Sequence, residues 1–376
     1  MKRKAGSVRD GAGCPVLSLD GTWLIAMDPK NIGREQGWPR KPPAAGTRET
    51  RVPSVIQETF AATHGVAWYW RRFTVPVHPL ARGRYLLRFH AVDYLAEVWV
   101  NGLSVGGHEG GETPFTLDVT DAVKKGTNSL AVRVLNPAAE PIDGMTLKQT
   151  PHRNKAIPFT PGSDANHGGI FLPVELLLVP AVRILDVHTV PDWRTGRVHV
   201  TVTVLNTLGS ARSATVGVRV APAQGGETLV LEQTSGSLPP GQSSVAVRLR
   251  VPDHRLWNLE DPCLYRITVT LTQGRDTDER SLRIGFRDFR VVRGFFRLNG
   301  KRILLKSTHT GNCTPGSLVI PPASAPSSWS CSISSWHDTY LLSCYQCPCT
   351  SAPASLLRLP SRYFLMASPT VRFAAR

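Results

Sequence analysis

The chain has 376 residues, of which 41% are hydrophobic and 19% are charged. This balance is typical of a globular protein with two or three domains and excludes a chain that is disordered throughout. The 44 basic and 28 acidic residues give a formal net charge of +16, but the basic residues are scattered along the sequence. The densest basic run, residues 1–4, is too short for a binding arm, so we expect no nucleic-acid partner.

Residues 1–15 are predicted to be a disordered N-terminus. They begin with basic residues, but no apolar segment follows, so the sequence shows no secretory signal. No later stretch is long and apolar enough to span a membrane, and we expect no membrane partner. With neither feature visible, a cytoplasmic location is the default expectation.

Residues 16–180 form the first predicted unit, which consists of short strands separated by Gly and Pro. Asp20-Gly21 predicts a turn, and Asn101-Gly102 predicts a hairpin because both of its residues tolerate positive φ. Ser54–Phe60 is the best helical candidate, with Ser54 able to cap it. Many short strands with such turns favour a β-sandwich or a β-barrel. The predicted strand runs are 16–23, 67–75, 85–92, 97–105, 129–134 and 174–179.

Residues 181–285 form a second unit with strictly alternating apolar positions. Residues 197–204 alternate without interruption, as expected of a half-buried strand. Similar runs occur at 216–220, 245–251 and 265–271. About 100 residues with roughly seven such strands indicate an immunoglobulin-like β-sandwich.

Residues 286–316 begin a third unit, in which Asn299-Gly300 separates two apolar runs and predicts another hairpin. After Gly316 the periodicity ends. Residues 317–376 are rich in Ser, Pro and Cys and contain a single acidic residue, Asp338. Such a mixture without periodicity predicts no packed core.

Four of the seven cysteines lie in this last segment and raise the question of a metal site. Cys344 and Cys347 form a CxxC pair, whereas a zinc site needs four ligands, usually from two such pairs. Adding Cys331 and His337 produces no common spacing. We therefore predict neither a metal nor another cofactor.

A series of motifs in chain order carries a family resemblance. The segments are Ser18–Trp23, Val52–Gln57, Trp68–Arg72, Phe89–Asp93, Val98–Gly102, His108–Phe115, Gly168–Leu176, Leu256–Tyr265, Ile284–Arg287 and Phe296–Lys306. Each alone is weakly specific, but together they resemble glycoside hydrolase family 2, the family of the β-galactosidases and β-glucuronidases. The resemblance covers residues 16–315.

The resemblance implies an all-β chain. A jelly-roll sugar-binding β-sandwich would occupy residues 16–180 and an immunoglobulin-like β-sandwich residues 181–285. Residues 286–316 would supply the first strand of a truncated (β/α)8 catalytic barrel, with Ser307 where the family usually has Gly. The family's two catalytic glutamates come from later barrel strands, and no position here matches either one. The resemblance therefore predicts no catalytic residue in this chain.

Candidate substrate-binding residues also follow from the resemblance. In relatives, the loop that contains Asp164, Asn166 and His167 here approaches the active site and touches the sugar. Asp and Asn side chains suit sugar hydroxyl groups because they offer hydrogen-bond acceptors and donors. A plain loop role is the alternative, and it is slightly favoured.

Two further groups have competing interpretations. Glu109 and Glu112 flank Gly110-Gly111 and suggest a catalytic carboxylate pair, but a solvated loop between strands is favoured. Alternation places Trp68 and Trp70 on one face of their strand and Tyr69 on the other. These aromatic rings are either a platform for sugars or part of a core, and core packing is favoured.

The sequence thus predicts the non-catalytic front of a glycosidase of carbohydrate metabolism. From residue 317 the chain resembles out-of-frame translation. The alternatives are a stand-alone carbohydrate-binding module and a β-sandwich interaction protein. Carbohydrate is the expected partner. Non-specific self-association through residues 295–306 is also expected, because this apolar strand would lack the neighbours that a barrel provides.

Overall fold

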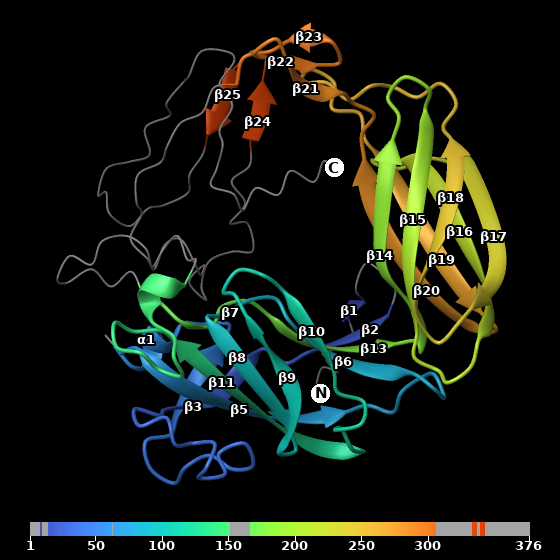
Figure 1. Ribbon diagram of the computed structural model, residues 1–376. Helices are drawn as coiled ribbons and strands as arrows, with labels where there is room; N and C mark the ends of the chain where they lie inside the picture. The colour runs from blue at the N-terminus through green and yellow to red at the C-terminus, as the bar shows by residue number, and fades with distance from the viewer. Residues whose placement is uncertain are drawn as a thin grey trace, which may run out of the picture.

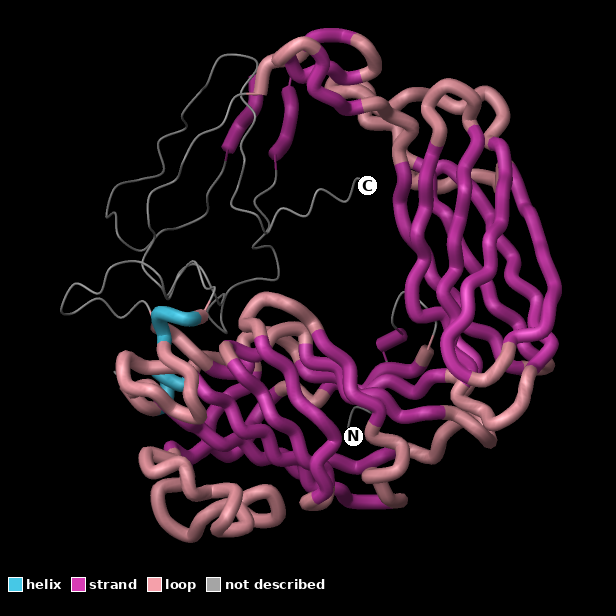
Figure 2. Tube along the Cα trace, viewed as in Figure 1, coloured by secondary structure: helices cyan, strands magenta, loops and turns pink. Residues whose placement is uncertain are grey.

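Two β-sandwiches follow one another along the chain, and a small three-stranded sheet lies at the end of the second sandwich that is remote from the first (Figure 1). The structure, a computed structural model, describes residues 8–9, 14–61, 63–150, 166–305, 333–336 and 339–342. Figure 2 shows that strands make up nearly all of the regular structure in these residues. The all-β prediction is confirmed.

The first sandwich consists of two antiparallel sheets. Its five-stranded sheet has the order β1-β2-β13-β6-β10, and its six-stranded sheet the order β4-β3-β5-β11-β8-β9. The strands of the first are β1 (Val8–Arg9), β2 (Pro15–Ser18), β6 (Arg84–Phe89), β10 (Phe115–Asp118) and β13 (Val174–Val179). Those of the second are β3 (Gly21–Met27), β4 (Arg48–Val52), β5 (Gly65–Val75), β8 (Leu95–Val100), β9 (Leu103–Glu109) and β11 (Gly126–Asn136).

The aromatic strand β5 is buried on both of its faces. Tyr69 belongs to the core between the two sheets, whereas Trp68 and Trp70 belong to a separate apolar cluster on the other side. The Trp68 ring stacks on Trp99 at 5.0 Å between centroids, and Trp38 packs edge-on against it at 6.1 Å. Because Trp68 has no exposed surface and Trp70 only 6%, the core interpretation of these rings is confirmed.

The second sandwich has seven antiparallel strands in two sheets, as the alternating sequence predicts. One sheet has the order β14-β15-β18 and the other β17-β16-β19-β20. On β15, Val198, Val200, Val202 and Val204 all face the core, which is the period of two expected of a strand. The strands are β14 (Val182–Pro191), β15 (Arg197–Asn206), β16 (Arg212–Pro222), β17 (Val230–Leu238), β18 (Gly241–Arg250), β19 (Tyr265–Gln273) and β20 (Asp276–Ile284).

Both predicted Asn-Gly hairpins are confirmed. Asn101 and Gly102 join β8 to β9 with φ values of 53° and 80°. Asn299 and Gly300 join β22 (Phe295–Leu298) to β23 (Lys301–Arg302) with φ values of 50° and 82°. Asn and Gly tolerate this left-handed region, and its twist matches that of the paired strands.

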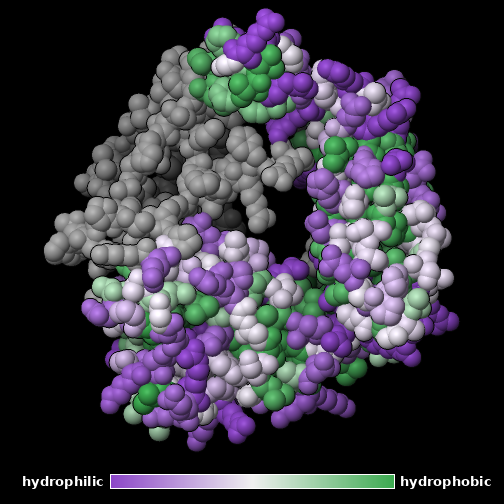
Figure 3. Space-filling model, viewed as in Figure 1, coloured by the Kyte–Doolittle hydropathy of each residue, from purple (hydrophilic) through white to green (hydrophobic). Residues whose placement is uncertain are grey.

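The three-stranded sheet adds β21 (Phe289–Val292) to β22 and β23. It is tied to the second sandwich by Asn299, whose side-chain amide donates to the Trp257 carbonyl at 2.9 Å. Figure 3 shows apolar side chains gathered on this sheet at the top of the view. Phe289, Val291 and Phe296 are 48%, 61% and 38% exposed, so its apolar face is open in the described part of the chain.

The helix expected at residues 54–60 is a single turn, α1 (Ile56–Thr59), and its predicted cap is wrong. Val55 occupies the N-cap position. The Ser54 hydroxyl donates to the Arg51 carbonyl, while its backbone N–H bonds to the Ile170 carbonyl at 2.9 Å. Ser54 therefore bonds to the segments before and after the helix and does not cap the helix itself. The other short elements are the 3-10 helix η1 (Leu147–Gln149), β7 (Val92–Asp93), β12 (Gly169–Ile170), β24 (Ile333–Trp336) and β25 (Thr339–Leu342).

Candidate functional site

The segment after residue 165 crosses one end of the first sandwich and is fixed there by backbone pairing. β12 pairs with β7, with Gly169 opposite Asp93 and Ile170 opposite Val92. On its other side, the Ile56 N–H at the start of α1 donates to the Gly168 carbonyl at 2.8 Å. The segment is therefore bonded to β7 on one side and to α1 on the other, so Asn166 and His167, which precede these bonded residues, are held close to both.

Gly168 and Gly169 permit this close approach. A Cβ on Gly168 would lie 2.4 Å from the Asn136 side chain. Gly169 has a φ of +137°, and a Cβ there would lie 2.9 Å from both the Ser54 carbonyl and the Tyr69 hydroxyl. Any larger residue would push the segment away from the sheet. The glycine pair thus sets the distance between this segment and the sandwich.

Asn166 anchors the start of the 166–170 segment through hydrogen bonds to buried parts of the first sandwich. Its side chain is 2% exposed and donates to the Pro137 carbonyl at 2.6 Å. Its own backbone carbonyl accepts hydrogen bonds from Asn136 at 3.2 Å and from Gln57 at 3.4 Å. One bond from the side-chain amide and two to the backbone carbonyl fix the position of Asn166 against the sandwich.

The three predicted sugar-binding residues are thus placed differently. Asn166 points into the domain, His167 is half-buried beside it, and Asp164 lies outside the described residues. The hydrogen bonds of Asn166 support an anchoring role for its side chain. Contact of these three residues with a sugar stays a prediction.

The turn after β9 is hydrogen-bonded to Tyr94, the residue that follows β7. The Tyr94 hydroxyl donates to the Glu109 carboxylate at 2.9 Å, and the Gly110 N–H donates to the Tyr94 carbonyl at 3.0 Å. Burial, together with the Glu109 carboxylate, raises the pKa of Tyr94 to about 12. Tyr94 is therefore a protonated donor at neutral pH.

The turn itself is pressed against a buried carboxyl group. Asp93 has no exposed surface, and a Cβ on Gly111 would lie 2.3 Å from its Oδ2 atom. Gly111 therefore lets the turn close over Asp93. Packing against Asp93 explains why glycine occupies position 111, without reference to catalysis.

Glu109, the last residue of β9, and Glu112, in the turn that follows, both have exposed side chains. Glu109 accepts the Tyr94 hydrogen bond, which gives it a structural partner. A carboxyl group acting as an acid catalyst needs surroundings that raise its pKa, such as a hydrophobic pocket. Exposure of both side chains therefore supports the solvated-loop interpretation over that of a catalytic pair.

A hollow of about 400 Å³ on the outer side of the six-stranded sheet was not predicted. It is lined by residues from three separate segments, among them Asp28, Asn31, His64 and Asp143. The Asp28 carboxylate already accepts the Trp68 indole N–H at 3.1 Å, and Asp143 pairs with Arg133 at 2.7 Å. The Asp28 and Asp143 carboxylates therefore have structural partners that hold the surrounding loops in place.

Two further expectations concern metals and membranes. In the described ranges, no group of three or more His, Cys, Asp or Glu side chains is arranged to hold a metal ion. The cysteines of the CxxC pair, Cys344 and Cys347, lie outside those ranges. Among the described residues, no helix is long and apolar enough to cross a membrane.

Comparison with known proteins gives two family matches. The profile described as "Glycosyl hydrolases family 2, sugar binding domain" matches residues 16–180. The profile "Glycosyl hydrolases family 2" matches residues 182–287. The two matches adjoin and together span both sandwiches.

Individual relatives agree with these matches. A beta-glucuronidase of Paenibacillus borealis is 27% identical over 312 residues, which is 77% of this chain and 48% of the relative. A beta-galactosidase of Aeromonas hydrophila subsp. hydrophila is 29% identical over 269 residues, 68% of this chain and 24% of the relative. Among solved structures, the b-glucuronidase of Ruminococcus gnavus has a TM-score of 0.60 at 25% identity. That match covers 78% of this chain and 48% of the solved one, so the chain spans a quarter to a half of these relatives.

Proposed function

The chain belongs to glycoside hydrolase family 2, and we propose that its two sandwiches are the sugar-binding and connecting domains of a retaining β-glycosidase. The parent enzyme would release a terminal β-linked sugar, in the manner of a β-glucuronidase or a β-galactosidase. The observation that carries this proposal is the unbroken match of both sandwiches, in order, to one family. Relatives named for both activities support the sugar class without choosing between them.

In this proposal the first sandwich places a loop at the active site of the parent enzyme. Asn166 and the Gly168-Gly169 pair fix residues 166–170 against β7 and α1. Such rigid support limits where that loop reaches, and pre-organised groups bind a substrate with less loss of entropy. Asp164 and His167 are the residues that we propose contact the sugar.

We further propose that this chain does not hydrolyse glycosides. Retaining hydrolysis requires a nucleophile and an acid, two carboxyl groups about 5–5.5 Å apart. Four carboxylates of the first sandwich have structural partners instead. Glu97 and Asp143 pair with Arg133, Asp118 pairs with Arg84, and Glu109 accepts from Tyr94.

The gene offers the test of this proposal. Its sequence around codon 316 should show that a one-base shift opens a frame encoding further barrel strands, including two glutamates. Restoring that frame should yield a protein that cleaves a nitrophenyl β-glycoside. If no other frame encodes a barrel, the proposal that this chain comes from a frame-shifted glycosidase gene fails. Saccharide binding by such a chain would then favour a stand-alone carbohydrate-binding module.

A further inference from the structure

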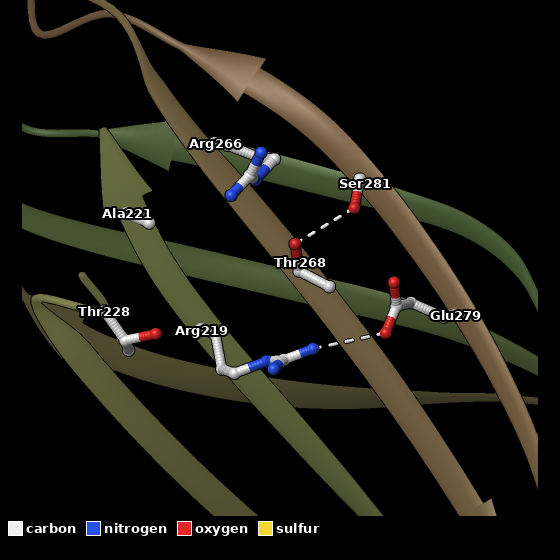
Figure 4. A pocket seen from close by; sticks show the side chains of 7 residues that line it. All are labelled: Arg219, Ala221, Thr228, Arg266, Thr268, Glu279 and Ser281. Atoms are coloured by element: carbon white, nitrogen blue, oxygen red, sulfur yellow. Dashed lines mark hydrogen bonds and ion pairs between the residues drawn. The ribbon is translucent and has the colours of Figure 1, made fainter. Parts of the chain in front are cut away.

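The outer face of the four-stranded sheet in the second sandwich carries a polar hollow of about 270 Å³. Its lining comes from β16, β19, β20 and the loop before β17, and all seven residues are labelled in Figure 4. They are Arg219, Ala221, Thr228, Arg266, Thr268, Glu279 and Ser281. The hollow lies in a different domain from the 166–170 segment.

The strand register explains why the surface is hollowed here. Ala221 lies opposite Arg266, and Arg219 lies opposite Thr268. A methyl group beside a long arginine leaves open space above the sheet. Across the next strand pair, the Thr268 hydroxyl hydrogen-bonds the Ser281 hydroxyl at 3.0 Å and forms a polar floor. Thr268 is only 9% exposed, so this floor is held firmly.

The charges around the hollow are unbalanced. Arg219 is neutralised by Glu279, at 3.2 Å. Arg266 instead faces Arg283, its direct partner on β20, and both side chains are exposed. Neither of these two arginines has an ion pair with a carboxylate among the described residues. Like charges directly opposite one another destabilise a sheet, so an anion between them would be bound favourably.

We propose that this hollow binds an acidic saccharide whose carboxylate lies between two guanidinium groups: that of Arg266, in the lining, and that of Arg283, which is opposite Arg266 on β20 beside the hollow. Guanidinium groups bind carboxylates with paired, charge-assisted hydrogen bonds. The Thr268 and Ser281 hydroxyls would bond to ring hydroxyl groups. The volume lies just below the range of about 300–1,000 Å³ for small-molecule pockets and suits a single sugar ring.

The hydroxyl groups around the hollow suit a saccharide. Aromatic anchors are common at the hot spots of protein interfaces. This face of β19 and β20 instead presents the hydroxyls of Thr268, Thr270, Thr272 and Ser281, with no aromatic side chain lining the hollow. The proposal does not depend on the catalytic proposal above, because binding here would not require a barrel.

The test titrates the full chain with oligogalacturonate, a uronate polymer, by isothermal calorimetry at low salt. The methyl-esterified oligomer keeps the hydroxyl groups but removes the charge, and it should bind at least about tenfold more weakly. The double variant Arg266→Gln/Arg283→Gln should weaken binding of the acidic oligomer by at least about tenfold, or about 1.4 kcal/mol. Glu279→Gln frees Arg219 from its ion pair and should tighten binding several-fold, a gain that misfolding cannot produce.

A matched control exists on the opposite sheet. Arg197 and Arg250 are also exposed, directly opposed arginines, on β15 and β18, and neither of them lines the hollow of about 270 Å³. Arg197→Gln/Arg250→Gln removes the same charge and should leave the affinity within about twofold. Equal losses in both double variants would show only non-specific attraction to a basic chain and overturn the proposal. The proposal would also be overturned if the methyl ester bound as tightly as the acidic oligomer, or if Glu279→Gln bound the acidic oligomer more weakly than the unmodified chain does.

Discussion

Arg133 offers the sharpest test of what stabilises the first sandwich. Its side chain has no exposed surface. Its guanidinium group donates to Glu97 at 2.7 Å, to Asp143 at 2.7 Å and to Asn31 at 2.6 Å. Arg34 joins the same two carboxylates from the surface, at 2.5 and 3.1 Å. The network connects β8 and β11 to two loops that cover the tryptophan cluster.

Replacing Arg133 with Met keeps much of the side-chain volume and removes the three hydrogen bonds. Breaking a buried ion pair costs about 3–5 kcal/mol when the remaining charge is buried and uncompensated. Here Glu97 and Asp143 are 30% and 31% exposed and keep Arg34, so the remaining charges are partly solvated. We therefore expect a loss of about 2–3 kcal/mol, which corresponds to about 4–12 °C in Tm for a domain of this size.

The assay is urea unfolding of the full chain, followed by the fluorescence of the tryptophans beside this network. Arg72→Met is the matched control, because Arg72 is an exposed arginine on the neighbouring strand β5. Its effect should stay within about 0.5 kcal/mol. A loss below about 1 kcal/mol for Arg133→Met, or equal losses in the two variants, would refute the assigned role of the network.

Three further predictions concern packing, pH and association. Gly168→Ala should destabilise the first sandwich by about 1–3 kcal/mol in urea, since its Cβ would meet Asn136 at 2.4 Å. Gly217→Ala, whose nearest contact is 3.7 Å away, should be close to neutral, and equal effects would contradict the packing argument. Burial raises the pKa of Asp143, but hydrogen bonds from Arg34 and the charge of Arg133 outweigh it, so its pKa lies below the ordinary value. The stabilisation that ionised Asp143 gives to the fold is therefore complete above the unfolded pKa of about 3.8 and is lost as pH falls through the folded pKa. In urea titrations across pH 2–6, Asp143→Asn should flatten the acid dependence of the free energy of unfolding. An unchanged slope would count against this role of Asp143. Finally, light scattering should show oligomers for the full chain and a monodisperse species for a chain ending at Arg287, because the exposed apolar strands around Phe296 are then removed; equal monodispersity would contradict this.

Local patterns in the sequence were sufficient where a feature depends on adjacent residues. The two Asn-Gly pairs predicted their hairpins because the required φ values are a property of the pair itself. The alternation of Trp68, Tyr69 and Trp70 predicted that their rings lie on opposite faces, and strand geometry enforces this directly. The seven strands of the second sandwich followed for the same reason.

Local sequence patterns could not predict contacts between segments that are far apart in the sequence. The Ser54 cap failed because Val55 takes the N-cap position. The Ser54 hydroxyl donates to the Arg51 carbonyl, and the Ser54 N–H bonds to Ile170, 116 positions later, so the residue is held outside the helix. The anchor of Asn166 needs Gln57, Asn136 and Pro137, whose proximity depends on strand order. The arginines of the acidic-saccharide site face one another only in the register of β19 with β20.

This chain carries the sugar-binding and immunoglobulin-like domains of its family, and we propose that it does not hydrolyse glycosides. The most direct measurement is hydrolysis of nitrophenyl β-glucuronide, β-galactoside and β-mannoside by the purified full chain, with the Ruminococcus gnavus b-glucuronidase as the positive control for the glucuronide. We expect no release of nitrophenol above that in buffer. Turnover that disappears in Glu109→Gln or Glu112→Gln would contradict it and make the turn after β9 the catalytic site.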